Sequence, residues 1–279
     1  MSFEGAGRAA LAEQRVDASG VLAVRRRVGR TRIERLFQEG AAKIRLPQGV
    51  GDPLEAVLIN TAGGLTGGDR LSWRISVAEG AHATVTTQAC EKVYRSSGGE
   101  ATSAIALDVG VGASLAWLPQ ETILFDGSAF RRTISADFAA GARGLIVEST
   151  LFGRLTMGET LRRGLFSDRW RIRSGGRLVH AEDFAIGPEV AGRLAARAAT
   201  GGACAVATVL ALRDDAEELL DRARALVGED GGASAWRVAE TGKFLARLIA
   251  EDGYGLRKRL MPLLQMLNGA AGLPKVWSI

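Results

Sequence analysis

Several carboxylates in this chain lie beside glycine-rich turns or inside apolar runs, where they could do chemistry. Asp69 closes the stretch LINTAGGLTGGDRL, Glu121 lies in LPQETILFD and Glu148 lies in LIVESTLF. A carboxylate in an apolar run must be paired, hydrogen-bonded or shifted in pKa. Two interpretations stay open for Glu121 and Glu148: a buried ion pair with one of the many arginines, or a functional role.

The glycine-rich stretch before Asp69 invites comparison with phosphate-binding loops. Its four glycines are Gly63, Gly64, Gly67 and Gly68. A P-loop continues with Lys and Ser or Thr, but here Asp69 and Arg70 follow, and a carboxylate would repel phosphate. The dinucleotide pattern needs glycines two apart, and this stretch has none. The stretch therefore predicts a tight turn between two strands, because glycine reaches positive φ without strain.

Histidine and cysteine are scarce, which limits the chemistry further. The chain has only His82, His180, Cys90 and Cys204, and none of them lies in a nucleophile motif or at zinc-finger spacing. We therefore predict neither a catalytic centre nor a tightly bound metal or cofactor, and we leave the roles of these four residues open. Two cysteines are too few for a disulfide framework, which fits a reducing, cytoplasmic setting.

Charge and hydropathy bound the possible partners. The net charge is +5, from 36 basic and 31 acidic residues. This mild basic excess suggests an acidic protein or a nucleic acid as partner. The scattered basic clusters lack interleaved aromatic residues, which weakens the nucleic-acid reading; they lie at 25–27, 131–132, 162–163 and 257–259. No apolar run is long enough to span a bilayer, and the first residues lack a secretory apolar region.

The elements that must position these residues are mostly strands. Alternation with a period of two dominates from about residue 40 to 185, as in LSWRISV (71–77) and AHATVTTQAC (81–90). The β-rich part as a whole is predicted to run from residue 20 to 212. We predict a mainly β protein that forms a single domain over residues 1–279. Further strand candidates are IALDV, LAWLP, TILFD, RTISADF, LIVESTLF and RLVHAEDF.

A weak internal repeat runs through this β-rich part. Strands beginning at Ile75, Ile105 and Ile134 are each followed by a Gly-Ala pair, with spacings of 29 to 32 residues. A period near 30 residues made of strand, turn and strand suggests stacked β-units that bury a shared core. A plain antiparallel meander would produce similar spacings, so both arrangements stay open at this point.

The C-terminal third changes character. Residues 213–228 predict a helix with an acidic start and Gly228 at its end. Residues 253–269 predict a second helix with a leucine stripe, in which Pro262 marks either a kink or a late start. The segments WRVAE (236–240) and KFLARLIAE (243–251) fit helix and strand equally well.

Five stretches taken together resemble the UreD (UreH) family of urease accessory proteins. They are NTAGGLTGGDRL, TTQACEKVYRS, WLPQETILFDGS, LFGRLTMGE and the terminal LPKVW, in an order that matches from about residue 20 onward. Cys90-Glu91 and Lys275 depart from the usual residues of the family. Besides the four glycines, the motif residues expected to bind partners are Lys92, Tyr94, Arg95, Gln120, Asp126, Arg154, Glu159, Lys275 and Trp277.

The resemblance implies a role in assembly instead of a reaction. Proteins of this family bind apo-urease and recruit UreF and the GTPase UreG, so that nickel enters the urease active site. The family fold implies stacked, β-helix-like strands with two helices in the C-terminal third, and it favours a strand for KFLARLIAE. The C-terminal helix and LPKVW are the first candidate for the UreF contact; the alternative is that they close the protein's own core.

A weak nickel path is one hypothesis for the three carboxylates. Oxygen ligands release Ni²⁺ more readily than histidine and cysteine do, so Asp69, Glu121 and Glu148 could line or gate a transient internal path. The structural alternative is that they fix strand corners through Arg154 or Arg95. Two other functions compete with the assembly role. One is an enzyme with a carboxylate site at the glycine-rich loop. The other is a basic β-rich module that binds nucleic acid or protein and has no role in metal delivery.

Overall fold

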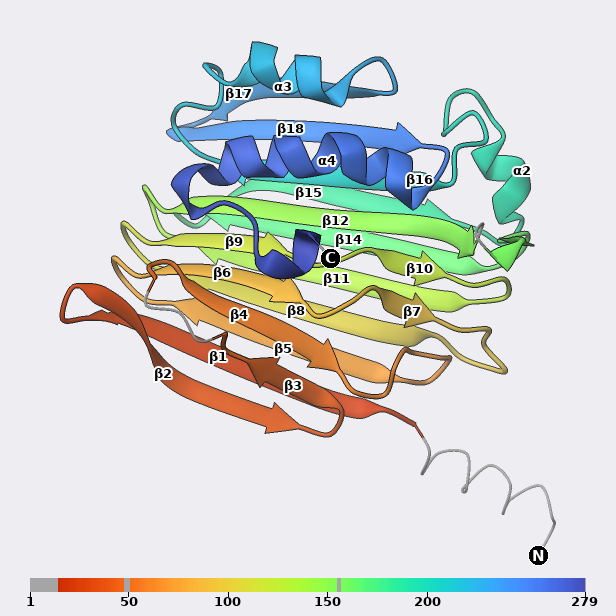
Figure 1. Ribbon diagram of the computed structural model, residues 1–279, viewed down its shortest axis with the longest axis horizontal. Coiled ribbons are helices and arrows are strands. Elements are labelled where there is room, and N and C mark those ends of the chain that lie inside the picture. Colours follow the sequence, from red (N-terminus) through yellow and green to blue (C-terminus); the bar gives the residue numbers. More distant parts are fainter. Residues whose placement is uncertain (1–14, 48–50, 155–156, 279) are drawn as a thin grey trace, which may run out of the picture.

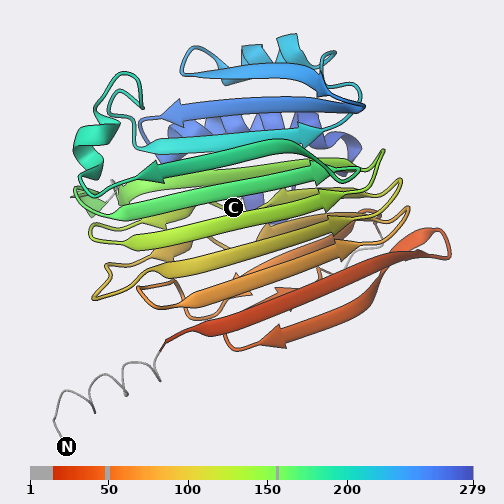
Figure 2. The same ribbon diagram turned by 180° about the vertical axis from the view of Figure 1, so that it is seen from behind.

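A computed structural model describes residues 15–47, 51–154 and 157–278 of the chain (Figure 1). One seven-stranded sheet forms the back layer, with strand order β15-β14-β11-β8-β5-β1-β2 (Figure 2). The five strands from β14 to β1 are parallel, and an antiparallel strand flanks them on each side. Its strands are β1 (Asp17–Arg27), β2 (Arg30–Glu39), β5 (Arg70–Val77), β8 (Ala101–Val109), β11 (Ala129–Phe138), β14 (Leu165–Ser174) and β15 (Arg177–Ile186).

A second sheet lies in front of the first, with main order β17-β18-β16-β12-β9-β6-β4-β3. Three short strands, β7, β10 and β13, extend it at the right-hand end in Figure 1. The main strands are β3 (Ala42–Arg45), β4 (Leu54–Asn60), β6 (His82–Thr87), β9 (Ser114–Leu118), β12 (Arg143–Arg154), β16 (Ala205–Leu212), β17 (Gly231–Val238) and β18 (Thr241–Ala250). The short ones are β7 (Glu91–Val93), β10 (Thr122–Leu124) and β13 (Glu159–Thr160).

The chain passes from one sheet to the other and back, so successive units stack as coils of a β-solenoid. The coils run from β4 to β5, from β6 to β8, from β9 to β11 and from β12 to β14. The Gly-Ala repeat is confirmed, because the residues that follow the three pairs, His82, Ser114 and Arg143, lie in register. Ile105 and Ile134 are also partners, but Ile75 pairs with Leu107. The neighbouring coils are parallel, so the meander alternative is wrong.

Two apolar cores explain why these strands alternate. Along β9 and β12, one set of side chains faces the back sheet and includes Leu115, Trp117 and Ile146. The intervening residues, among them Leu118 and Val147, face the helical layer instead. The central strands β9, β12 and β16 are therefore covered on both faces, which is why their sequences are apolar at most positions.

The helices agree with the sequence in part. Helix α4 (Gly253–Asn268) is confirmed, with Asp252 as its N-cap and Pro262 inside it, so Pro262 does not mark a late start. Helix α3 (Leu220–Val227) begins later than the predicted residue 213, because Arg213 holds the Asp215 carboxylate in a turn before it. The short helix α2 (Val190–Leu194) was not predicted.

The β-rich part extends beyond its predicted limits. β1 begins at Asp17, and β17 and β18 follow after residue 212. KFLARLIAE forms most of β18, so the strand that the family resemblance favoured is confirmed. None of the described helices is long and apolar enough to cross a membrane.

Candidate functional site

The family motifs come together at one edge of the solenoid, where the coils turn from the second sheet to the back sheet. Leu65 N donates to Lys92 O at 2.7 Å, and Phe125 N donates to Val93 O at 2.9 Å. Gly127 N then donates to Arg163 O at 2.7 Å. Segments 61–69, 91–100, 120–128 and the described residues of 153–164, which are 153–154 and 157–164, therefore stack on one another, and we call this stack the corner column.

The glycine-rich turn is confirmed, and its glycines are required for different reasons. A Cβ on Gly64 would overlap the Tyr94 ring, and Gly64 has φ +151°. A Cβ on Gly67 would overlap Ser96 Oγ and the carbonyl oxygen of Gly98, although the φ of Gly67 is not positive. Gly63 has φ +76° but open space around it, so it serves the turn geometry alone.

These differences predict unequal costs of alanine substitution. We expect Gly67→Ala to lower the unfolding free energy by about 3 kcal/mol, because the methyl group must displace backbone of the next coil. Gly63→Ala should cost only about 1 kcal/mol, the price of a left-handed non-glycine residue. Urea unfolding of both variants measures the difference, and equal costs would show that close packing of the coils does not determine the motif.

Asp69 is buried and bound by the turn itself. Its Oδ1 accepts a hydrogen bond from Val16 N at 2.9 Å, and its Oδ2 accepts one from Thr66 N at 2.7 Å. The carboxylate thus ties the turn to the start of β1. Neither Arg95 nor Arg154 contacts it within the described chain, so the predicted arginine partners are wrong for Asp69.

The outer part of the corner column is aromatic and charged. The Tyr94 and Phe125 rings meet edge to face at 4.9 Å, and Tyr94 Oη donates to Gly63 O. The Arg154 guanidinium lies 4.1 Å from the Phe125 ring centre and pairs with Glu159 at 2.5 Å. These four motif residues therefore contact one another, and the contacts account for their residue types without a bound ligand.

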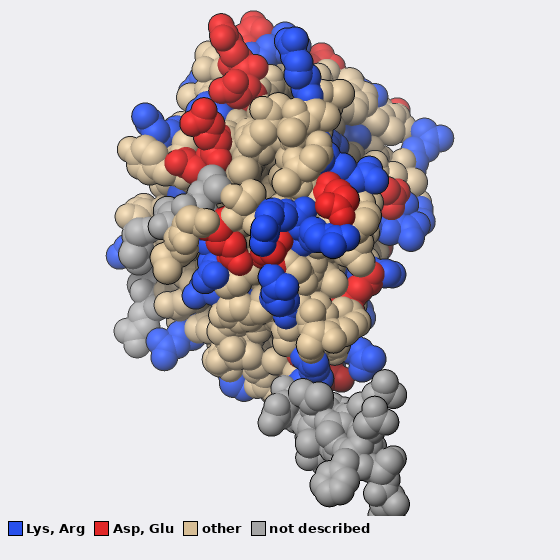
Figure 3. Space-filling view, turned by 90° about the vertical axis from the view of Figure 1, so that its right-hand side faces the viewer, with Lys and Arg blue, Asp and Glu red and all other residues tan. Residues whose placement is uncertain are grey.

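Asp126 ties the last two motif segments together. Its Oδ1 accepts hydrogen bonds from the backbone N–H groups of Arg163 and Arg162, and its Oδ2 pairs with Arg95 at 3.1 Å. The Arg163 N–H bond, followed by the other cationic and N–H partners, lowers the pKa of Asp126. Figure 3 shows this end of the molecule, where basic side chains gather with acidic ones among them.

A pocket of about 280 Å³ opens beside the corner column. Its walls are mostly apolar, with Phe125, Lys92 and Arg154 among the motif residues that line it. Tyr254 and Met157, 74% and 73% exposed, line it as well. The pocket also contains Cys204, whose pKa is raised by burial. A side chain of a protein partner would fit its size and chemistry.

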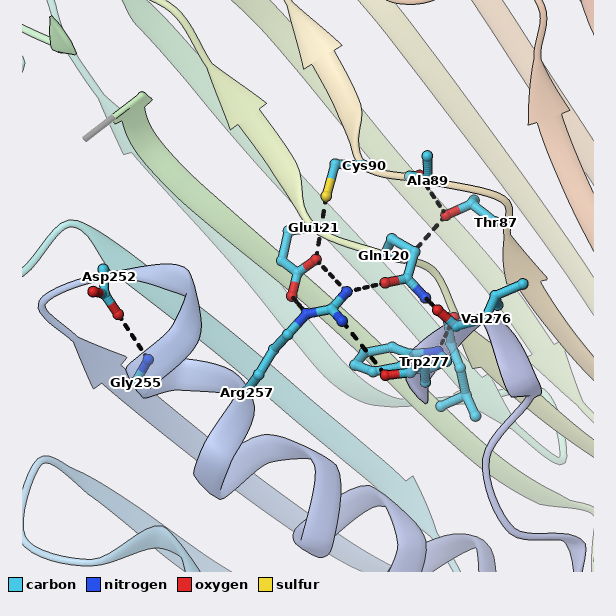
Figure 4. Close-up of polar contacts among 11 residues, drawn as sticks. Thr87, Ala89, Cys90, Gln120, Glu121, Asp252, Gly255, Arg257, Val276 and Trp277 are labelled. Carbon is cyan, nitrogen blue, oxygen red and sulfur yellow. Dashed lines mark hydrogen bonds and ion pairs between the residues drawn. The ribbon is translucent and has the colours of Figure 1, made fainter. Parts of the chain in front are cut away.

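Arg257 joins helix α4 to the third coil (Figure 4). It donates to both carboxylate oxygens of Glu121, at 2.7 and 3.0 Å, and to the side-chain oxygen of Gln120. Trp277 lies beside it, 1% exposed, with Nε1 donating to Leu118 O at 3.1 Å. The terminal LPKVW segment thus packs against the protein's own core, which favours the second of its two interpretations.

Burial would raise the pKa of Glu121, but the hydrogen bonds and charge of Arg257 lower it below its ordinary value. Cys90 Sγ donates to Glu121 Oε2 at 3.4 Å. Burial, together with this neighbouring carboxylate, raises the pKa of the Cys90 thiol to about 12. Cys90 is therefore protonated at neutral pH, and a protonated thiol is a poor nucleophile and a poor metal ligand.

Glu148 lies between the two sheets in a buried network. Its Oε1 accepts from Trp117 Nε1 at 2.9 Å, and its Oε2 pairs with Arg132 at 2.5 Å. Arg132 also binds Asp168 through two hydrogen bonds, at 3.0 and 2.6 Å. One cation thus serves two buried carboxylates. Burial, opposed by Arg132 but supported by the charge of Asp168, raises the pKa of Glu148 to about 7.

Glu91, half-buried at the start of β7, is a second acid with a raised pKa. Its carboxylate accepts from Asn60 Nδ2 at 3.0 Å, and its backbone N–H donates to Glu121 O. Burial raises its pKa to about 7, and the hydrogen bond from Asn60 only partly opposes this. Glu91 and Glu148 are thus the two acids of the described chain whose pKa values are raised to about 7.

The three carboxylates of the nickel hypothesis have separate partners. Asp69 binds backbone N–H groups, Glu121 binds Arg257 and Glu148 binds Arg132. Within the described residues, no three His, Cys, Asp or Glu side chains are grouped to hold a metal ion. The buried ion pairs are confirmed, but their arginines are not the predicted Arg154 and Arg95. Spacing along the sequence gave no signal for Arg132 or Arg257, because both pairs join distant strands or helices.

The other singled-out residues lie outside the corner column. Lys275 lies in the short 3₁₀ helix Lys275–Ser278 and, with Glu55, lines another pocket. His82 Nδ1 is 2.8 Å from Ser114 Oγ, on the next coil. The buried His180 lies 3.5 Å from Glu182 and packs edge-on against Trp170. His82 thus has a hydrogen-bond partner on the next coil, whereas the buried Nε2 atom of His180 makes no hydrogen bond within the described residues.

The four basic clusters do not form one surface. Residues 25–27 lie at the β1–β2 hairpin, and 162–163 lie at the corner column. Arg132 and Arg257 pair inside the molecule, while Arg259 donates to the carbonyl oxygens of Val227 and Ile249. Nucleic-acid binding requires a continuous basic stripe or patch, so this distribution does not support that alternative.

Comparison with known proteins agrees with the motifs. A model of the UreD urease accessory protein family matches residues 16–278. A urease accessory protein UreD from Mesorhizobium japonicum is 59% identical over 251 residues, 90% of each chain. One named UreD 1 from Brucella abortus is 56% identical over 269 residues, 96% of each chain. The similarity thus includes the corner column, the buried ion pairs and helix α4, and the chain belongs to the UreD urease accessory protein family.

Proposed function

We propose that this protein is a non-catalytic scaffold that binds apo-urease and recruits UreF and the GTPase UreG for nickel insertion. Membership of the UreD family implies a role in urease maturation, and the match over residues 16–278 carries the proposal. The described chain supports a scaffold, since buried polar pairs such as Trp117 with Glu148 and Arg132 with Asp168 join neighbouring coils. Its two free cysteines fit a cytoplasmic assembly.

We further propose that Ni²⁺ is a passing cargo that no site in this chain holds tightly. Asp69, Glu121 and Glu148 are the oxygen donors of this path, with Glu148 innermost between the sheets. Carboxylates without histidine or thiolate neighbours bind Ni²⁺ weakly and can release it to a site of higher affinity.

Co-expression tests the scaffold role. The chain is expressed with the apo-urease subunits, with and without UreF and UreG, and the urease is purified and its nickel content measured. We expect the chain to co-purify with apo-urease and the nickel content to fall to background when the chain is omitted. A folded chain that does not bind any urease subunit would overturn the proposal.

Three substitutions separate the nickel path from the scaffold. Asp69→Asn, Glu121→Gln and Glu148→Gln are compared with Glu218→Gln, an exposed acid before helix α3. We expect each of the three to lower the nickel content at least several-fold while the complex with apo-urease still forms. If the urease in all three complexes contains as much nickel as with the unmodified protein, the nickel-path proposal fails and the scaffold proposal stands.

A further inference from the structure

The β1–β2 hairpin projects beyond the rest of the solenoid. β1 pairs with β5 only from Asp17 to Val24, whereas Arg25–Arg27 pair with β2 alone. Figures 1 and 2 show this tip extending past the turns of the neighbouring coils. Arg26 stiffens the tip by donating to Gly80 O and Gly29 O and by pairing with Asp52. The tip is therefore a rigid projection.

An unusual residue occupies the end of this projection. Val28 is 94% exposed and has φ +51°, the left-handed region that β-branched residues disfavour. It forms a two-residue turn with Gly29, at φ +74°, and the sequence that best suits such a turn is Asn-Gly. Val28 thus contributes nothing to the core and opposes the turn geometry. Strain of this kind is typical of functional sites.

The surroundings of Val28 are strongly basic. The hairpin carries Arg25, Arg26, Arg27, Arg30 and Arg32 within eight residues, all of them exposed. Arg25 pairs with Glu34 and Arg26 with Asp52. The other three have no acidic partner in the part of the chain that the structure describes. The tip thus presents one apolar side chain surrounded by unneutralised guanidinium groups.

Strand β2 continues this surface along the edge of the back sheet. Ile33, Leu36 and Phe37 are 42%, 37% and 41% exposed, which is high for large apolar side chains. Within the described residues β2 pairs only with β1, so its outer backbone groups are free. An exposed apolar edge strand is a site where another chain can add.

We propose that the β1–β2 tip inserts Val28 into an apolar pocket rimmed by carboxylates on apo-urease. This inference rests on the proposed function and adds the contact surface to it. Guanidinium groups bind carboxylates in paired hydrogen bonds, so the three unpaired arginines complement an acidic rim. A protein fits better than a bilayer, which needs a broad apolar face. It fits better than single-stranded nucleic acid, because residues 25–32 contain no aromatic side chain for base stacking and Phe37 lies further along β2.

The test uses Val28→Asn, because asparagine favours the left-handed turn and leaves the fold at least as stable. A second variant, Arg27→Glu with Arg30→Glu, reverses the charge around Val28. The control is Val111→Asn, at another exposed turn where the valine is 57% exposed. Binding of each full-length protein to immobilised apo-urease is measured, together with its melting temperature. Vesicles of anionic phospholipid and a single-stranded RNA serve as further probes.

We expect Val28→Asn and the charge reversal each to weaken apo-urease binding at least tenfold, with the melting temperature of Val28→Asn unchanged or raised. Val111→Asn should bind like the unmodified protein. If that protein binds and Val28→Asn binds equally well, the tip proposal fails and the scaffold stands. If the unmodified protein does not bind apo-urease at all, the proposed function fails as well. If only vesicle or RNA binding depends on the tip, a different class of partner replaces the one proposed.

Discussion

Replacing Arg132 by methionine is expected to lower the unfolding free energy by about 3 to 5 kcal/mol at pH 7. Arg132 is 3% exposed and is bound by both Glu148 and Asp168, which are also buried. Methionine fills the volume of the side chain but leaves two carboxylates facing each other without a cation. Much of the variant should be insoluble, since the loss is a large part of a typical domain's stability.

The neighbouring arginine gives a matched control. Arg131→Met removes an exposed ion pair with Glu100 on the opposite face of β11, and it should cost less than about 1 kcal/mol. A triple variant, Arg132→Met with Glu148→Gln and Asp168→Asn, should regain much of the loss because no charge remains buried. Solubility and urea unfolding report all three. A soluble, stable Arg132→Met protein would show that water reaches this network.

The second large expected effect is a change of the unfolding free energy with pH, to which Glu91 contributes. An unfolded Glu91 ionises near 4.5, whereas the folded protein keeps it protonated up to a pKa of about 7. Its stabilising contribution is therefore complete below pH 4.5 and is lost as the pH rises through 7. The full loss is about 3 kcal/mol for a shift of this size. Glu91→Gln should remove this loss.

Urea unfolding at pH 5 and pH 8 measures the effect. Relative to the unmodified protein, Glu91→Gln should be more stable at pH 8 than at pH 5 by up to about 3 kcal/mol. Glu121→Gln is the control, because Arg257 lowers the pKa of Glu121 and its contribution stays constant above pH 4.5. If the difference in unfolding free energy between Glu91→Gln and the unmodified protein is the same at both pH values, the Glu91 carboxylate is solvated in the folded protein.

The sequence predicts those parts of the fold whose signal lies within one short segment. It does not predict those that depend on specific side-chain contacts. The Gly-Ala pairs mark the same turn on successive coils, so the repeat alone was enough to suggest stacked units. The start of α3 was wrong because Arg213 binds Asp215, a contact that propensity does not contain. KFLARLIAE was ambiguous, since a strand apolar on both faces lacks the alternation that distinguishes strand from helix.

The candidate site is likewise predictable only where the signal lies within a short segment of sequence. Glu121 and Glu148 stand out because a carboxylate in an apolar run requires a partner, and the structure supplies one for each. The partners themselves, Arg257 and Arg132, are 136 and 16 residues away in the sequence. No spacing rule selects them from 36 basic residues. Val28 was also missed, because its conformation and exposure are visible only in the folded hairpin.

The number of stacked coils also sets the length of the solenoid along the stacking direction. Each coil adds one strand spacing, about 4.8 Å, along the stacking direction. Since coils contact mainly their neighbours, gaining or losing one unit of about 30 residues would leave the remaining coils intact. β1 and β2 begin the stack, β17 is the last strand of the second sheet at the other end, and helix α4 lies in front of the strands near that end (Figure 1). Adding or removing one coil would therefore change the distance between the two ends of the stack by about 4.8 Å.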